Sequence, residues 1–153
     1  MSIMVIYESF YGNTEQIAQA VAQTVGAELC RVDAVDWDRL QAANIVIFGC
    51  PTRAFHASEG MGKLLKGLDK AALEGKQVSA FDTRMDVEQH PSKMLRFMAH
   101  RFGYAANKIQ KQLIAKGGEE LGEPAWFLVD GMEGPLHEGE IDRAKEWAKK
   151  LIQ

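Results

Sequence analysis

The chain has 153 residues, of which 46% are hydrophobic and 25% are charged, and its formal net charge is −3 at pH 7. These values are typical of one ordinary globular domain, so we treat residues 1–153 as a single domain. A weakly acidic chain gives no electrostatic reason to expect nucleic acid as a partner, and no apolar run reaches the roughly 20 residues of a membrane span.

The N-terminus and the cysteines bear on the compartment. The first residues show no basic flank and no cleavage site, so no signal peptide is predicted. Without a secretory signal, Cys30 and Cys50 are expected to be reduced thiols rather than a disulfide. We therefore expect a cytoplasmic protein.

The first third of the chain alternates between strand-like and helix-like patterns. Residues 2–7 are almost entirely apolar, which predicts a strand buried on both faces. From Asn13 onward, apolar residues recur every four positions until Gly26, which predicts a helix. A second strand is expected at 27–32, a short helical turn at 36–43 and a third strand at 44–49.

The remaining two thirds continue the alternation. A loop at 50–60 leads to an expected helix at 61–68, and residues 76–82 predict the fourth strand. Helical spacing predicts helices at 91–102 and 107–118. A fifth strand is expected at 123–130 and a closing helix at 139–152.

Strands that alternate with helices favour parallel strands joined by right-handed crossovers. The expected fold is therefore α/β: a three-layer, doubly wound sandwich in which helices cover both faces of a five-stranded parallel sheet. In such folds ligands bind beyond the carboxyl ends of the strands, at the point where the strand order reverses. The loops after the first, third and fourth strands are the candidate site.

The first of these loops has the sequence YESFYGNT and joins a strand directly to a helix N-terminus. Free backbone N–H groups and the helix dipole favour an anion at such a terminus. Gly12 permits a left-handed or close turn, while Ser9, Asn13 and Thr14 supply neutral donors. The combination predicts a phosphate cradle. The alternative is that Asn13 or Thr14 simply caps the helix.

The longer stretch VIYESFYGNTEQIAQAV resembles the signature of the flavodoxin family, and the likeness in length and strand order extends over the chain. The resemblance implies a flavodoxin-like fold with strand order 2-1-3-4-5 and FMN bound at the switch point, an arrangement for which flavodoxin is itself the standard example. It also implies that the first loop holds the FMN phosphate. The residues carried over for that role are Ser9, Phe10, Tyr11, Gly12, Asn13 and Thr14.

The same resemblance assigns the other two loops to the flavin. After the third strand, Pro51, Thr52, Arg53, Ala54 and Phe55 are expected beside the ribityl chain and the ring. A flat apolar ring stacks well on an aromatic side chain, so Phe55 is the first choice to cover it and His56 the second. After the fourth strand, Asp82, Thr83 and Arg84 are expected at the ring, with Met85 available to close its other face. That loop lacks the tyrosine often found in the family.

Charge near the ring bears on its reduction potential. Arg53 and Arg84 offset Asp82, Asp86 and Glu88 in this sequence. A unit charge about 8 Å away contributes roughly 2 kcal/mol at an effective dielectric constant of about 20. The two arginines are therefore expected to raise the potential.

The expected function is that of an FMN-binding protein that shuttles electrons between redox partner proteins, as a monomer or weak dimer. No residue is assigned a catalytic role, and the four histidines lack metal-ligand spacing, so no metal is predicted. One alternative is an FMN-dependent reductase of a small quinone-like substrate. Another is a binding module of the same fold that has lost FMN. Residues 91–103 are open to three interpretations: a lid, a docking surface or plain scaffold.

Overall fold

A computed structural model describes residues 1–53, 55–87 and 91–153. Ala54, expected beside the flavin, and Glu88, counted among the acidic residues near it, lie outside the described residues, and so does the side chain of Phe102. Among the helices described, none is long and apolar enough to cross a membrane.

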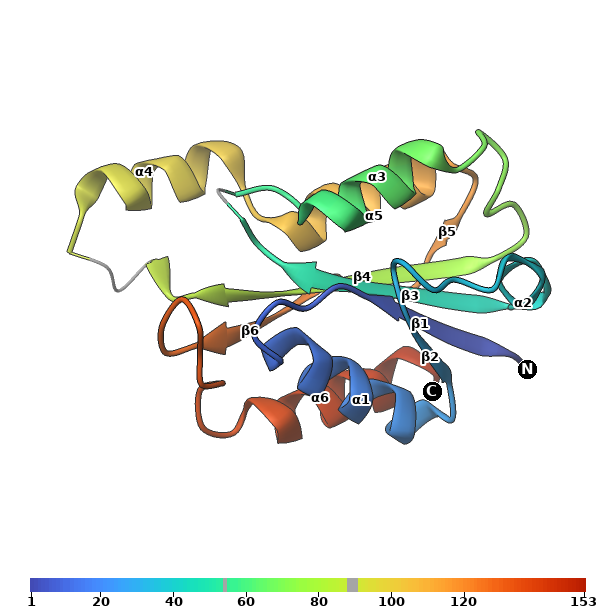
Figure 1. Ribbon diagram of the computed structural model, residues 1–153, viewed down its shortest axis with the longest axis horizontal. Coiled ribbons are helices and arrows are strands. Elements are labelled where there is room, and N and C mark those ends of the chain that lie inside the picture. The colour runs from blue at the N-terminus through green and yellow to red at the C-terminus, as the bar shows by residue number, and fades with distance from the viewer. Residues whose placement is uncertain (54, 88–90) are drawn as a thin grey trace.

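The centre of the molecule is a parallel sheet whose strands run in the order β2-β1-β3-β4-β5, with β6 also paired to β4 (Figure 1). This order confirms the expected 2-1-3-4-5 topology. The strands β1, β3 and β4 are buried along most of their length because helices cover both faces. Their bounds are β1 Ile3–Tyr7, β2 Glu28–Arg31, β3 Ile45–Pro51, β4 Gln77–Met85, β5 Glu119–Glu120 and β6 Ala125–Val129.

The fifth position in the sheet is filled by two short segments instead of one strand. β5 pairs with the start of β4 and β6 with its end. The Leu121 N–H still donates to the Val78 carbonyl, and residues 122–124 separate the two segments. Gly122 takes a left-handed conformation there, and Pro124 has no N–H to donate, so pairing cannot continue through this stretch. The strand predicted at 123–130 is thus found at 125–129, and β5 was not predicted.

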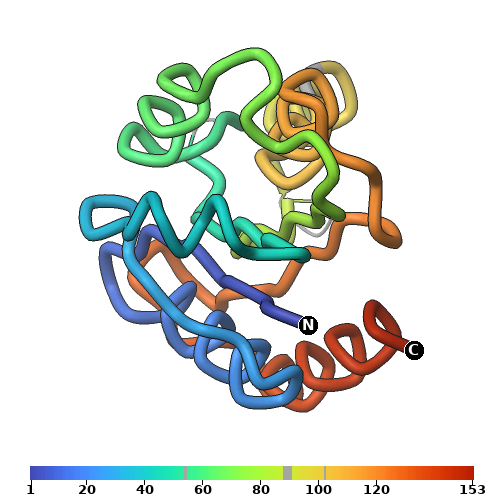
Figure 2. Tube along the Cα trace, turned by 90° about the vertical axis from the view of Figure 1, so that its right-hand side faces the viewer, coloured from blue at the N-terminus to red at the C-terminus, as the bar shows by residue number. Residues whose placement is uncertain are grey.

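The helices form the two outer layers of the sandwich, which Figure 2 shows above and below the sheet. α3 and α5 cover one face, and α1 packs beside α6 on the other. α4 lies at the end of the molecule where β4 ends (Figure 1). Their bounds are α1 Asn13–Val25, α2 Trp37–Ala42, α3 Glu59–Gly67, α4 Lys93–Phe102, α5 Ala105–Ala115 and α6 Glu140–Leu151.

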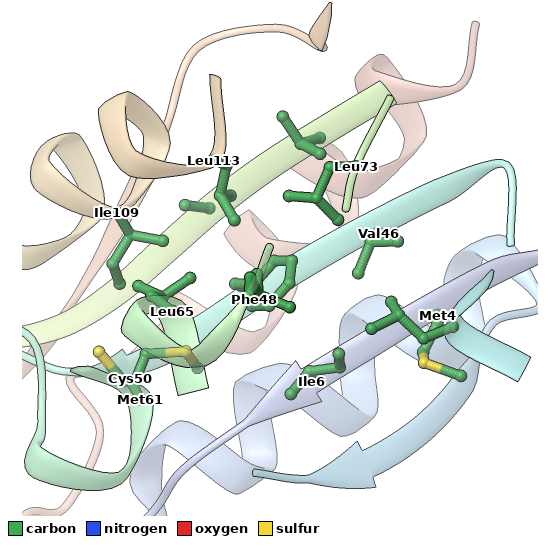
Figure 3. Close-up of a cluster of buried hydrophobic side chains, with 14 of the residues drawn as sticks. Met4, Ile6, Val46, Phe48, Cys50, Met61, Leu65, Leu73, Ile109 and Leu113 are labelled. Atoms are coloured by element: carbon green, nitrogen blue, oxygen red, sulfur yellow. The ribbon is translucent and has the colours of Figure 1, made fainter. Parts of the chain in front are cut away.

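Each face of the sheet has its own apolar core. Figure 3 shows the core under α3 and α5, where Phe48 of β3 lies beside side chains from both helices, such as Leu65 and Leu113. On the opposite face, Phe81 and Phe127 pack edge-to-face against each other and against Trp147 of α6. The two cores hold the strands rigidly, so the strand ends present the loops of the site in a defined geometry.

Candidate functional site

A pocket of about 300 Å³ opens at the carboxyl ends of the strands. This volume is at the lower end of the range for small-molecule sites, and the lining is mainly apolar, as such sites usually are. The loops after β1, β3, β4 and β6 all contribute to it, together with α4 and the residue before α5. The lining residues are Ser9, Phe10, Tyr11, Asn13, Thr14, Pro51, Thr52, Arg53, Phe55, Thr83, Arg84, Met85, Val87, Leu95, Tyr104, Val129 and Met132.

At one side of the pocket, α1 begins without a side-chain cap. The residue at the N-cap position is Gly12, in a left-handed conformation with φ of 90°, and neither Asn13 nor Thr14 caps the helix. The Gly12 N–H donates to the Ser9 hydroxyl at 3.1 Å, which closes the turn. The capping alternative is therefore wrong. Backbone N–H groups in the first turn of α1 lack intrahelical acceptors and face the region where an anion would sit.

The side chains of this turn have hydrogen-bond donors available for a ligand. Asn13 gives one amide proton to the Glu133 carbonyl at 3.1 Å and has a second one. The hydroxyls of Thr14 and Thr83 lie 2.7 Å apart, so one of them donates and the other retains its proton. Ser9 accepts from Gly12 and so keeps its own proton for a ligand. Neutral donors thus surround the helix N-terminus, as an anionic group requires.

The loop after β3 forms a second wall, and its arrangement depends on Phe55. This residue has a φ of 65°, which is rare for a bulky side chain, and its ring is buried and meets Tyr104 edge-to-face at 6.0 Å. Its carbonyl accepts from the Lys108 ammonium at 2.6 Å, which holds the strained backbone in place. Arg53 lies over the Phe10 ring at 4.8 Å and so joins this loop to the first one.

The loop after β4 contains a buried ion pair. Both oxygens of Asp82 accept from Arg84, each at 2.7 Å, and one of them also accepts from the Ala106 N–H at 2.9 Å. Asp82 is fully buried and does not line the pocket, so the expected ring contact of its side chain is not available. Arg84 does line the pocket, but Asp82 compensates its charge. The pair has no net charge, and the effect of Arg84 on a flavin's potential stays a prediction.

Tyr104 is the main pocket residue that sequence reasoning missed. It comes from the junction between α4 and α5, and the Arg84 guanidinium stacks over its ring at 3.6 Å. The pocket therefore has an aromatic wall, although no tyrosine follows the fourth strand. The only local sequence signal was a tyrosine at the start of a helix, which does not distinguish a pocket residue from a core residue.

Other missed lining residues are apolar and lie far apart in the chain. Leu95 belongs to α4, Val87 follows β4, and Val129 and Met132 come from the end of β6 and the loop after it. Met85, expected as a possible cover for the ring, does line the pocket. Apolar residues in these positions could equally have been core residues, so the sequence held no signal for them.

The structure also places the remaining residues considered for the site relative to the pocket. Pro51, Thr52 and Thr83 line the pocket as expected, and the Thr52 hydroxyl also accepts from the Ala105 N–H at 3.2 Å. Gly12 shapes the turn without lining the pocket. Cys50 is buried, and this burial raises the pKa of its thiol to about 12, so it is a packing residue and not a reactive one.

Comparison with known proteins gives a consistent result. A sequence model of the family described as "Flavodoxin domain" matches residues 4–121. A flavodoxin from Clostridium saccharobutylicum is 25% identical over 158 residues, which cover 99% of this chain and 95% of that one. Among solved structures, oxidised Flavodoxin 2 from Bacillus cereus superposes with a TM-score of 0.77 at 20% identity, covering 99% of this chain and 98% of that one. A "flavodoxin, WrbA-like protein" from Agrobacterium tumefaciens has a TM-score of 0.74 at 22% identity, covering 98% and 94%.

Proposed function

Because this chain belongs to the flavodoxin domain family, we propose that it binds FMN in the pocket at the strand ends and carries electrons between redox partner proteins. The observation that carries the proposal is the uncapped N-terminus of α1 beside an apolar pocket of ligand size. A ligand with a phosphate group on one end and a flat apolar ring on the other matches both features.

One group of residues would bind the phosphate and another would contact the ring. Ser9, Asn13 and Thr14, with the first-turn N–H groups of α1, would hold the phosphate. Phe55 and Tyr104 offer aromatic surface for the ring, and Arg84 keeps Tyr104 in position. When bound, the flavin supplies the redox chemistry, and the protein binds it, orients it and sets its electrostatic surroundings. No side chain need act as a general acid or base.

The test compares FMN with riboflavin, which has the same ring but no phosphate. Flavin fluorescence, followed during titration of the apoprotein, reports both dissociation constants. Hydrogen bonds to a charged group contribute roughly 1.5–3 kcal/mol each, so FMN is expected to bind at least about 100-fold more tightly.

Two variants make the comparison sharper. Ser9→Asp places a negative charge in the cradle and is expected to remove the preference for FMN while leaving riboflavin binding nearly unchanged. Gln19→Asp adds the same charge to an exposed site on α1 and is the matched control. Equal affinities of the wild-type protein for the two flavins would contradict the phosphate cradle, and no binding of either would favour a module that has lost FMN.

A second candidate function is the reduction of a small quinone-like substrate with FMN as cofactor. It draws support from the apolar wall formed by Met85, Leu95 and Val129, which could accept a flat substrate beside the ring. Steady oxidation of a reduced nicotinamide on addition of a soluble quinone, by purified FMN-loaded protein, would favour it. The absence of turnover, with FMN still bound, would favour the electron carrier.

A further inference from the structure

Two large apolar side chains on α4 are exposed, and nothing in the described chain covers them. Leu95 points to the pocket and Ala99 is buried, so these residues form the inner side of the helix. Met94 and Phe97, one turn apart on another side, are 72% and 67% exposed. Figure 1 shows α4 at the end of the molecule where β4 and β6 also end. Leu95 of this helix lines the pocket. Large apolar side chains with this exposure indicate a surface that meets another molecule.

Methionines are concentrated at the same end. Met4 and Met61 lie in the core. By contrast, Met85 and Met132 line the pocket, and Met94 and Met98 belong to α4. Met132 is 76% exposed. Methionine is flexible and polarisable, and it is used where a surface must adapt to a partner.

Charge is also distributed unevenly. Residues 91–108 include four Lys or Arg and no Asp or Glu, which leaves 14 basic residues against all 21 acidic ones elsewhere in the chain. A protein with a net negative charge therefore has a positive segment beside its pocket. Lys93 and Arg101 are exposed on α4, next to Phe97 along the helix. This distribution favours an acidic surface at α4 over the rest of the molecule.

We propose that the α4 surface, defined as Lys93, Met94, Phe97 and Arg101, docks a redox partner protein whose own contact surface has an apolar centre and an acidic rim. The proposal rests on the proposed electron-carrier function. Aromatic, Met and Arg side chains are the types enriched in protein–protein contacts. A lipid surface fits less well, because Met94 and Phe97 are the only large, apolar and exposed side chains among those described on α4, and its inner side faces the pocket.

The experiment uses a plant-type ferredoxin, a small acidic iron–sulfur protein, as the probe. Protein with ¹³C-labelled methionine methyl groups, in the FMN-loaded form, is titrated at low ionic strength and observed by NMR. The signals of Met85, Met94, Met98 and Met132 are expected to shift or broaden. Those of Met4 and Met61 should stay unchanged, because both side chains are buried. Added salt should weaken the binding at least tenfold.

Paired variants separate charge, apolar contact and folding. Lys93→Glu/Arg101→Glu is expected to weaken the interaction at least tenfold, and Met94→Ser/Phe97→Ser should weaken it similarly. Lys149→Glu/Lys150→Glu makes the same charge change on exposed residues of α6 and should bind like the wild-type protein. Circular dichroism and the FMN absorption spectrum of each variant show whether the fold and cofactor are retained.

Several results would overturn the inference. One is a titration without changes in the pocket-end methionines, and another is binding that the α4 variants do not alter. A third is that cytochrome c, a basic haem protein, produces the same methionine changes. A fourth is that the wild-type protein sediments with phosphatidylglycerol vesicles and the Met94→Ser/Phe97→Ser variant does not. That result would show that the α4 surface binds a lipid surface and not a partner protein. If FMN does not bind but ferredoxin docking persists, only the proposed function fails, whereas bound FMN without docking refutes only this inference.

Discussion

Arg84 owes its position in the pocket to Asp82, a residue that does not line the pocket. The carboxylate accepts two hydrogen bonds from the guanidinium and a third from the Ala106 N–H at the start of α5. It therefore links β4, the pocket wall and the N-terminus of α5. Through Arg84 it also places the ring of Tyr104, over which the guanidinium stacks.

Asp82→Asn should therefore destabilise the protein strongly. The Asp82 side chain is fully buried and that of Arg84 is 11% exposed, so the substitution leaves a nearly buried cation without its counter-charge. A loss of about 3–5 kcal/mol in the free energy of unfolding is expected, measured by urea denaturation. Glu59→Gln, which breaks an exposed pair with Lys63, is the control and should cost less than about 1 kcal/mol. If Asp82→Asn also cost less than about 1 kcal/mol, stacking on Tyr104 alone would be enough to hold Arg84.

Glu140 is a second buried carboxylate, and it makes stability depend on pH. Burial by itself raises the pKa of this carboxyl. Hydrogen bonds from Arg143 and from the Leu128 N–H outweigh burial, so the pKa in the folded state is lowered. Because the folded pKa lies below the unfolded one, the stabilisation is fully present above the unfolded pKa and is lost as pH falls through the folded pKa.

Glu140→Gln should remove this pH-dependent contribution. At pH 7 the variant is expected to lose about 1–3 kcal/mol of unfolding free energy relative to the wild-type protein. The difference should narrow as the pH falls below about 4.3, the ordinary pKa of glutamate. Urea titrations at several pH values test this, with Glu138→Gln on the exposed neighbouring residue as control. A difference that stays constant down to pH 3 would show that the ionised carboxylate is not the cause.

At the scale of elements, the Phe81 ring of β4 lies so close to residue 49 of β3 that this position must be glycine. A Cβ at Gly49 would lie 2.0 Å from Cζ of Phe81 on β4. The Phe81 ring cannot yield, because it is fully buried between Phe127 and Trp147. The packing of the Phe81 ring over β3 therefore depends on the absence of a side chain at residue 49.

Gly49→Ala is expected to cost about 3 kcal/mol or more, or to prevent folding, because it overpacks the core. Phe81→Leu in the same chain should recover part of the loss, since it removes the atoms that the new methyl group meets. Gly62→Ala is the control: nothing lies within 4 Å of its Cβ, and alanine in helix α3 should be neutral or stabilising by up to about 1 kcal/mol. Thermal denaturation, followed by circular dichroism, measures the stability of the two single glycine variants and of the double variant. Additive losses in the double variant would show that Phe81 is not the obstacle.

At the scale of the whole molecule, the pocket depends on loops from both halves of the chain. The Asn13 side chain at the start of α1 donates to Glu133 in the loop after β6, and a Cβ on the adjacent Gly134 would lie 2.6 Å from the Asn13 amide. Thr14 and Thr83 connect α1 to β4. A ligand that fills the pocket should therefore stabilise the complete fold.

FMN is accordingly expected to raise the melting temperature. At a free concentration 100-fold above the dissociation constant, a ligand that binds only the folded state stabilises it by about 2.7 kcal/mol. For a domain of this size that corresponds to a rise of roughly 5–11 °C. Differential scanning calorimetry with FMN, and with riboflavin at the same concentration as control, tests it. An equal rise with both flavins would contradict a role for the phosphate cradle.

The local patterns of the sequence determined most of the secondary structure and the first loop. Apolar strands, helical spacing and their alternation depend on residues close together in the chain, and they predicted a parallel α/β sandwich. The strand order was expected from the resemblance to the flavodoxin family. The turn through Ser9, Gly12 and Thr14 was predictable for the same reason, because a strand followed directly by a helix N-terminus is a local feature. The interruption between β5 and β6 was missed, since it depends on how the edge segments pair with β4.

Tertiary structure alone decided which distant side chains meet at the pocket. Tyr104, Leu95 and Met132 join residues of the first loop there, and no short-range pattern connects them. It also decided that Asp82 turns inward and compensates the charge of Arg84. Contacts of this kind follow from the crossovers and from the packing of helices on the sheet. Sequence spacing specifies which face a residue occupies on its own element, whereas its neighbours are set by the elements that pack against that face.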